Sequence, residues 1–194
     1  MMSFIDSFDL AVAEFAAAVA KNCGFLTMPL KIITLSGTAG AIFIVAAAIL
    51  IIFVRTRTAG IKAGGALLVG FILTNLLLKN IIARPRPYED VTSRFFEIWQ
   101  NAGSLKESGF SFPSGHTTAA TAFGVSLFIS LNKKYSWAFL LIPLVMGFTR
   151  IYFCVHFASD VLGGMAVGTV AAILSQLVSD FILKKLSFNA EKRN

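Results

Sequence analysis

Charged residues are scarce in this chain of 194 residues. Asp, Glu, Lys and Arg together make up 14% of the sequence, whereas a soluble domain averages about 25%. Hydrophobic residues supply 56%, and Phe alone occurs 19 times. This composition excludes intrinsic disorder and is not typical of a soluble globular protein. It predicts one compact domain, residues 1–194, embedded in a membrane.

Cysteine and histidine are also rare, with two residues of each. Cys154 lies in an apolar stretch, so a disulfide framework is not expected, and no metal-ligand spacing is present. We therefore expect no metal and no cofactor. A basic start followed by an apolar core and a cleavage site is absent, which argues against a cleaved signal peptide.

Long apolar runs account for most of the chain. Five runs approach the roughly 20 residues that a membrane-spanning helix needs. We predict an all-α fold, a polytopic membrane bundle of five spans, at residues 32–54, 63–78, 110–132, 135–155 and 161–179. The net charge of +7 suggests an anionic partner, but nucleic-acid-binding proteins do not usually carry such runs, so no nucleic acid is expected.

The N-terminal segment, residues 1–31, has a different pattern. Apolar residues recur at helical spacing from Phe4 to Val19, and three acids, Asp6, Asp9 and Glu14, interrupt them. This pattern predicts an amphipathic helix that lies in the membrane interface. A sixth span here is the alternative, and Glu14 disfavours it.

The placement of Lys and Arg along the chain predicts which ends of the spans face the cytoplasm. Basic residues concentrate in residues 55–62, 133–134 and 184–193, which fall on one side of a five-span zigzag. We assign that side to the cytoplasm and the protein to the cell (inner) membrane. Residues 32–185 then form the helical core, 186–194 a cytoplasmic tail, and the 83–111 loop faces outward.

Several ionisable groups lie where a membrane protein should avoid them. A charge inside a spanning helix costs about 2.5–3.5 kcal/mol on insertion scales, so it needs a reason. Arg150 sits deep in an apolar run, whereas Lys79 ends the second predicted span, Asp160 opens the last, and His116 and His156 lie next to the outer face. These five groups are therefore expected at one membrane depth. Each has an ordinary explanation, such as a snorkelling Lys, a helix-capping His or an Arg150–Asp160 ion pair. Together they form a chemically coherent set.

The cations of this set, together with Arg86 in the adjoining outer loop, suit a phosphate group. Lys79, Arg86 and Arg150 would supply point charge and forked donors to its oxygens. Ser114 is a candidate N-cap of the helix that carries His116, and N–H groups at a helix N-terminus bind phosphate.

The two imidazoles and the single carboxylate suit group transfer. His156 and Asp160 are four residues apart and share a face if they are helical. A carboxylate bonded to one ring nitrogen fixes the tautomer and leaves the other nitrogen free to attack. His116 could then protonate the departing oxygen. The set predicts a metal-independent phosphoryl-transfer site.

The spacing resembles the three-part signature of the type 2 phosphatidic acid phosphatase superfamily. The matching segments run in order along the chain, as Lys79-x6-Arg86-Pro87, Pro113-Ser114-Gly115-His116 and Arg150-x5-His156-x3-Asp160. That superfamily includes bacterial lipid phosphate, phosphatidylglycerophosphate and undecaprenyl diphosphate phosphatases. Thr149 stands where the family often has Ser, a change that keeps the hydroxyl. Arg84-Pro85 adds a second Arg-Pro pair, and we expect Arg84 to be a rim or headgroup contact.

The resemblance implies a role for each residue of the signature. His156 would be the nucleophile that forms a phosphohistidine, Asp160 would orient it, and His116 would be the general acid and later the base. The phosphoryl oxygens would be held by Lys79, Arg86, Ser114, the Gly115 backbone and Arg150.

The expected substrate is a membrane lipid phosphate or isoprenoid diphosphate, because the site lies at headgroup depth. Two alternatives use the same residues: a lipid phosphotransferase, and a non-catalytic phospholipid-binding or transport protein. Small residues near Gly164 permit close helix packing, which we expect to serve the monomer rather than an oligomer.

Overall fold

The computed structural model describes residues 3–131 and 133–191, and every regular element in these ranges is helical. Lys192 and Arg193 of the predicted tail lie outside the described residues. The α-helices are α1 (Phe4–Asn22), α2 (Thr27–Ser36), α3 (Ala41–Ile52), α4 (Arg57–Phe71), α5 (Lys79–Ile82), α6 (Arg94–Asn101), α7 (Gly115–Ser130), α8 (Lys133–Ser136), α9 (Leu141–Tyr152) and α10 (Ala158–Glu191). Short 3-10 turns are η1 (Gly24–Leu26), η2 (Thr38–Gly40) and η4 (Trp137–Leu140), and η3 (Ile72–Leu78) is a π-helix.

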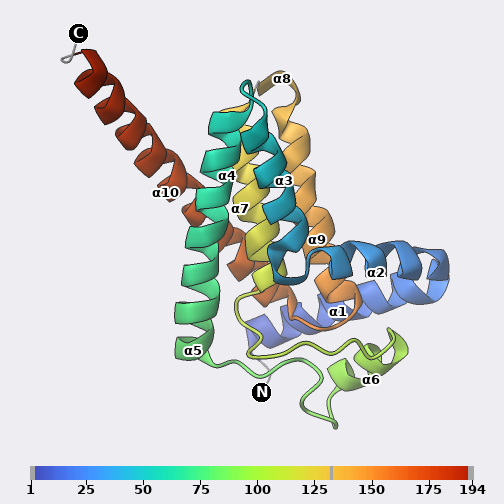
Figure 1. Ribbon diagram of the computed structural model, residues 1–194. Coiled ribbons are helices and arrows are strands. Elements are labelled where there is room, and N and C mark those ends of the chain that lie inside the picture. Colours follow the sequence, from blue (N-terminus) through green and yellow to red (C-terminus); the bar gives the residue numbers. More distant parts are fainter. Residues whose placement is uncertain (1–2, 132, 192–194) are drawn as a thin grey trace.

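Helix α7 occupies the middle of the molecule and contacts α3, α4, α9 and α10 (Figure 1). Helices α1 and α2 lie across one end of this bundle, next to α6. The turn between α3 and α4 lies at the opposite end, together with α8. The two ends of the bundle are therefore built differently: one carries short turns, and the other carries the long loop and the N-terminal helices.

Glycines set the close contact between α7 and α10. A Cβ on Gly164 would lie 2.7 Å from the carbonyl oxygen of Ser114, and one on Gly168 would lie 2.6 Å from that of Thr118. Backbone cannot move aside as a flexible side chain can, so these positions require glycine. These two glycines serve packing within the chain, as the sequence predicted.

Three helical stretches are long and apolar enough to cross a membrane: Arg57–Ile82, Lys134–Tyr152 and Ala158–Lys185. They correspond to the second, fourth and fifth predicted spans. The count becomes four if Phe4–Asn22 and Gly24–Ser36, which meet at a bend of 98°, are taken as one broken span. The first and third predicted spans correspond to shorter helices, so the five-span count is not established by length and composition.

The boundary between the N-terminal segment and the first predicted span is wrong in the sequence analysis. Residues 32–36 belong to α2, and the chain turns at Gly37–Gly40 before α3 begins. Ala39 and Gly40 have φ values of 52° and 72°, which turn the backbone between the end of α2 and the start of α3. No charge marks this turn, so a search for uncharged runs passes through it.

The third predicted span also begins too early, because α7 starts at Gly115 rather than at residue 110. Residues 110–114 form non-helical chain, and the peptide bond before Pro113 is cis. The second predicted span is correct in place but extends further at both ends. Its π-helical turn, η3, buries Thr74, whose hydroxyl donates a hydrogen bond of 3.0 Å to the Thr118 hydroxyl on α7.

Candidate active site

A cavity of about 750 Å³ opens among α3, α4, α7 and the loops at the α5 end of the bundle. Five of the residues predicted from the sequence line it: Lys79, Arg86, Gly115, His116 and His156. They come from segments far apart in the chain, and the fold brings these predicted site residues together around one cavity. Asp160, Ser114 and Arg150 are fully buried beside this cavity rather than on its surface.

His156 is held in the turn between α9 and α10. Its Nδ1 lies 3.5 Å from the Oδ2 atom of Asp160, which opens α10. The same Oδ2 accepts hydrogen bonds from the Ser111 hydroxyl at 2.5 Å and from the Phe157 N–H at 2.9 Å. Asp160 is therefore fixed from three sides, and it faces one nitrogen of the imidazole.

The other nitrogen, Nε2 of His156, lies 3.4 Å from Nη1 of Arg86. Burial lowers the pKa of His156 to about 4, and the hydrogen bond with Asp160 opposes that shift. The imidazole is thus neutral at neutral pH, which is the form that can act as a nucleophile.

Arg86 organises the loop around the cavity. Its Nε donates to the carbonyl oxygen of Gly109 at 2.8 Å, Nη1 to that of Val155 at 2.9 Å and Nη2 to that of Ser108 at 2.8 Å. Because three carbonyls share one guanidinium, the 108–110 loop and the His156 turn are fixed to each other. Arg86 brings positive charge to the cavity without an acidic partner among these contacts.

Arg150 does not pair with Asp160, which corrects one of the ordinary explanations considered above. Its Nη2 instead donates to Oε1 of Glu107 at 2.5 Å, and its Nη1 donates to the hydroxyl of Thr34 on α2. Burial raises the pKa of Glu107, but the neighbouring Arg150 outweighs this and holds that pKa below its ordinary value. Glu107 is thus an anion that lines the cavity in front of Arg150.

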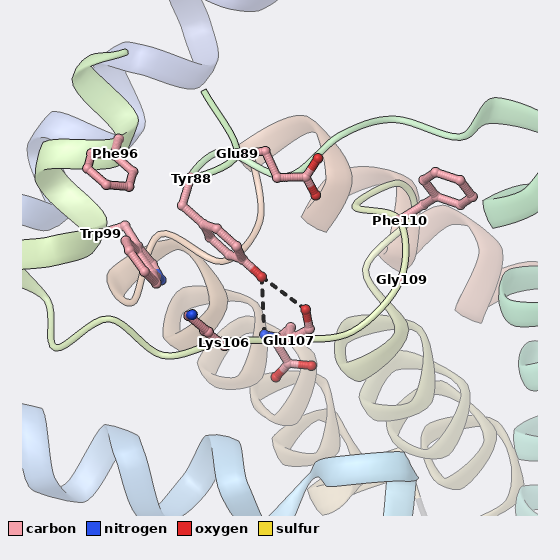
Figure 2. Close-up of a pocket in the computed structure, with 8 residues that line it drawn as sticks. All are labelled: Tyr88, Glu89, Phe96, Trp99, Lys106, Glu107, Gly109 and Phe110. Atoms are coloured by element: carbon pink, nitrogen blue, oxygen red, sulfur yellow. Dashed lines mark hydrogen bonds between the residues drawn. The ribbon is translucent and has the colours of Figure 1, made fainter. Parts of the chain in front are cut away.

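Glu107 is not among the residues predicted from the sequence, because no local pattern in the outer loop marks it. The backbone of Glu107 is hydrogen-bonded twice to Tyr88, as Figure 2 shows. The Tyr88 hydroxyl donates to the Glu107 carbonyl at 3.0 Å and accepts from the Glu107 N–H at 3.1 Å. Tyr88 in turn stacks on Trp99 with ring centroids 4.7 Å apart. These contacts line a second, outer cavity of about 520 Å³ that shares Glu107 with the first.

Ser114 caps the N-terminus of α7 as predicted, but its hydroxyl does not line the cavity. Ser114 is the N-cap, and its hydroxyl accepts from the Thr117 N–H and from the Thr117 hydroxyl at 3.0 Å. That hydroxyl is occupied by the cap and is not among the groups that line the cavity. Gly115 and His116, one and two residues on, do line it, and Nε2 of His116 has no hydrogen-bond partner within the described residues.

Arg84 is not a rim residue, contrary to the expectation from the sequence. Its Nη1 donates to Oδ1 of Asp160 at 2.7 Å, and its Nη2 donates to Oδ2 of Asp9 on α1 at 2.9 Å. The guanidinium also lies 3.9 Å from the centre of the Phe157 ring. Arg84 therefore supports the carboxylate behind His156 from the side away from the imidazole.

Comparison with known proteins identifies the family of this chain. The family model of the PAP2 superfamily matches residues 59–182, which include all three segments of the signature. The chain belongs to the PAP2 superfamily, the type 2 phosphatidic acid phosphatase superfamily that its motifs resemble.

Two relatives and one solved structure illustrate the similarity. The chain is 29% identical to an undecaprenyl-diphosphatase of Sulfolobus acidocaldarius over 75% of its own length and 68% of that protein. It is 35% identical to phosphatidylglycerophosphatase B of Bacillus subtilis over 53% of its own length and 49% of the relative. A crystal structure of a transmembrane PAP2-type phosphatidylglycerolphosphate phosphatase from Bacillus subtilis superposes with a TM-score of 0.69 at 27% identity, covering 93% of this chain and 89% of that one.

Proposed function

We propose that this protein is an integral membrane phosphatase that hydrolyses a lipid phosphate or isoprenoid diphosphate, of the undecaprenyl diphosphate or phosphatidylglycerophosphate class. The coarser part of this statement follows from the family and the relatives: the chain is a phosphoric ester hydrolase acting on lipid phosphates. The substrate class, the covalent intermediate and the side of the membrane are the proposal.

The observation that carries the proposal is the shape and lining of the larger cavity. One end holds Lys79, Arg86 and both histidines, and the other end is apolar and lies between α3 and α4. The apolar lining is contributed by Ile44, Ala47, Ala48, Ile51, Leu67, Leu68 and Phe71. A cavity that is cationic at one end and apolar at the other fits an amphiphile, whose phosphate meets the cations while its chain remains among apolar side chains.

The first chemical step uses His156 as the nucleophile. Its Nε2 attacks the phosphorus atom, and the bond from phosphorus to the leaving oxygen breaks. His116 gives a proton to that oxygen, and the product is a phosphohistidine on His156. Asp160 holds the proton-bearing Nδ1, so the lone pair of Nε2 faces the cavity.

The second step returns the enzyme to its starting state. His116, now without its proton, takes one from water, and the oxygen attacks the phosphorus atom of the phosphohistidine. The N–P bond breaks, inorganic phosphate leaves, and Nε2 of His156 is free again. Lys79 and Arg86 line the cavity where negative charge develops in both steps, and fixed cations in a partly dry site stabilise such charge strongly.

We place the site on the extracytoplasmic side. The basic residues between α3 and α4 and those at α8 lie at the end of the bundle opposite α5 and α6 (Figure 1). An excess of Lys and Arg marks cytoplasmic loops, so the site end faces outward. Helix α1 lies across that end, an orientation expected of an interfacial helix.

Phosphate release from purified protein tests the proposal. The substrates are undecaprenyl diphosphate, phosphatidylglycerophosphate, phosphatidic acid and a soluble phosphate ester, each measured with EDTA present. We expect turnover of at least one lipid substrate, with little activity on the soluble ester. Equal activity on the soluble ester would contradict the lipid assignment. Loss of activity in EDTA that magnesium restores would contradict the metal-independent mechanism.

A further inference from the structure

Asp9 is an acid on α1 that the mechanism above does not use. It lies outside residues 59–182, and its side chain has no exposed surface. Every other acid on α1 is exposed, including Glu14, whose side chain is 53% exposed. Burying a carboxylate costs several kcal/mol unless other groups compensate for the lost water. The partners of Asp9 therefore indicate why a membrane-surface helix carries it.

The partners of Asp9 are Arg84 and Ser159, which also hold Asp160, the carboxylate next to His156, in place. Oδ1 of Asp9 accepts from the Ser159 N–H at 2.7 Å, and Oδ2 accepts from the Ser159 hydroxyl at 2.7 Å and from Nη2 of Arg84 at 2.9 Å. Ser159 immediately precedes Asp160 in the first turn of α10. Asp9 thus binds both the residue beside Asp160 and the cation paired with it.

Arg84 connects the two carboxylates. While Nη2 is bonded to Asp9, Nη1 donates to Oδ1 of Asp160 at 2.7 Å and to the Ser159 hydroxyl at 2.7 Å. This leaves Oδ2 of Asp160 for His156. A forked guanidinium held at both ends keeps its target carboxylate in one orientation, which a single bond does not do.

We propose that Asp9 is a positioning residue, through which docking of α1 sets the geometry of the His156–Asp160 pair. The inference rests on the proposed function of that pair. Without the Asp9 carboxylate, Arg84 and the first turn of α10 lose the group that bonds both of them. Asp160 can then rotate away from Nδ1 of His156. Small displacements of catalytic groups cost up to about 100-fold in rate.

The test is a double-mutant cycle in the purified full chain, with phosphate release as the readout. Asp9→Asn keeps the size of the side chain and removes its charge. We expect kcat to fall by about 10- to 100-fold, with KM changed by less than about twofold. Glu14→Gln is the matched control, because it removes an ion pair between the same helix and Arg94 at 3.4 Å, away from the site. It should leave kcat within about twofold.

The second arm of the cycle distinguishes a role of Asp9 in positioning Asp160 from a role only in stabilising the fold. Asp160→Asn alone is expected to lower kcat by up to about 10⁴-fold. If Asp9 acts through Asp160, adding Asp9→Asn in that background should lower kcat by less than about twofold more. An equal loss in both backgrounds would mean that Asp9 only stabilises the fold and would overturn the proposal, as would wild-type kcat in Asp9→Asn.

If Asp9→Asn does not fold, Ser159→Ala replaces it, because it removes the hydroxyl shared by Asp9 and Arg84 without burying an unpaired charge. The same cycle with Asp160→Asn then decides the question by the same criterion. His156→Ala is measured in parallel. Activity in His156→Ala would refute the proposed mechanism itself, whereas an inactive His156→Ala with an unaffected Asp9→Asn would refute only the role of Asp9.

Discussion

The two walls of the cavity differ in how completely their polar groups are bonded. The dyad wall consists of His156 and Arg86, which line the cavity, and of Asp160, Arg84 and Ser111, which lie behind them. It is a continuous network in which each side chain has protein partners. On the open wall, made of Lys79, Gly115 and His116, the Nε2 atom of His116 has no partner within the described residues.

This difference separates two tasks. The proposed nucleophile, His156, must be held in one position and one tautomer before the substrate arrives, and the contacts of the dyad wall suit that task. Groups that bind phosphate or pass a proton to the leaving oxygen need unsatisfied hydrogen-bonding capacity in the free enzyme. The open wall retains that capacity. Variants on the two walls should therefore fail in different ways.

The largest effect is expected on the dyad wall. His156→Ala removes the proposed nucleophile, so kcat should fall by at least about 10³-fold for every substrate. The fold should persist, because the small turn between α9 and α10 is also fixed by Arg86. Phosphate release, with circular dichroism as the check on folding, measures this. Retention of more than a tenth of the activity would show that another group attacks.

On the open wall, the effect of His116→Ala should depend on the leaving group. A general acid contributes about 10²- to 10⁴-fold when the departing oxygen needs a proton. A lipid alkyl phosphate should lose activity in that range, whereas an aryl phosphate that carries a lipid chain, whose phenolate leaves unaided, should lose much less in the first step. Burst kinetics with both substrates measures the difference. Equal losses for the two would contradict the role of His116 as the acid.

Lys79→Gln should have a smaller effect that falls on binding and charge stabilisation. Removal of one cation from the cavity is expected to lower kcat/KM by about 10- to 100-fold. Lys106→Gln is the control, because Lys106 is exposed and lines the outer cavity instead. It should change kcat/KM by less than about twofold. Equal effects of the two substitutions would mean that Lys79 contributes only general positive charge.

The smallest predicted effect is a displaced titration. With its pKa near 4, His156 stays neutral as the pH falls from 7 to about 5, whereas an ordinary histidine would become protonated below about 6.5. Protonation occupies Nε2, so the nucleophile is lost only near pH 4. NMR of ring-labelled histidine, assigned with His156→Gln, measures this value. A titration near 6.5 would show that the dyad wall is not buried as described.

The residues of the open wall and the His156–Asp160 pair of the dyad wall could be predicted from the sequence. The motifs have fixed internal spacing, so His116 follows its cap by two residues and His156 precedes Asp160 by four, although His156 lies in the turn before α10 rather than in a helix. Spacing within a segment carries over directly into geometry. Hydropathy likewise predicted three of the helical stretches, because each is bounded by charges.

The supporting contacts could not be predicted, because they join distant segments. Asp9 and Glu14 look alike in the sequence, as acids that interrupt an apolar helix, yet one is buried against Arg84 and the other is exposed. Glu107 pairs with Arg150 across 43 residues, and only the folded loop brings them together. Nothing in the sequence around Arg84 indicates that it bonds both Asp9 and Asp160, so the sequence predicts only a rim or headgroup contact for it.

Trapping the covalent intermediate tests the central claim most directly. His116→Ala is mixed with an aryl phosphate that carries a lipid chain and whose leaving group needs no acid, and the reaction is stopped in alkali, where phosphohistidine survives. If His116 is also the base for the second step, the phosphoenzyme accumulates, and mass spectrometry of peptides should place one phosphoryl group on His156. A phosphoryl group on another residue, or product formation with no phosphoenzyme in any variant, would contradict the account.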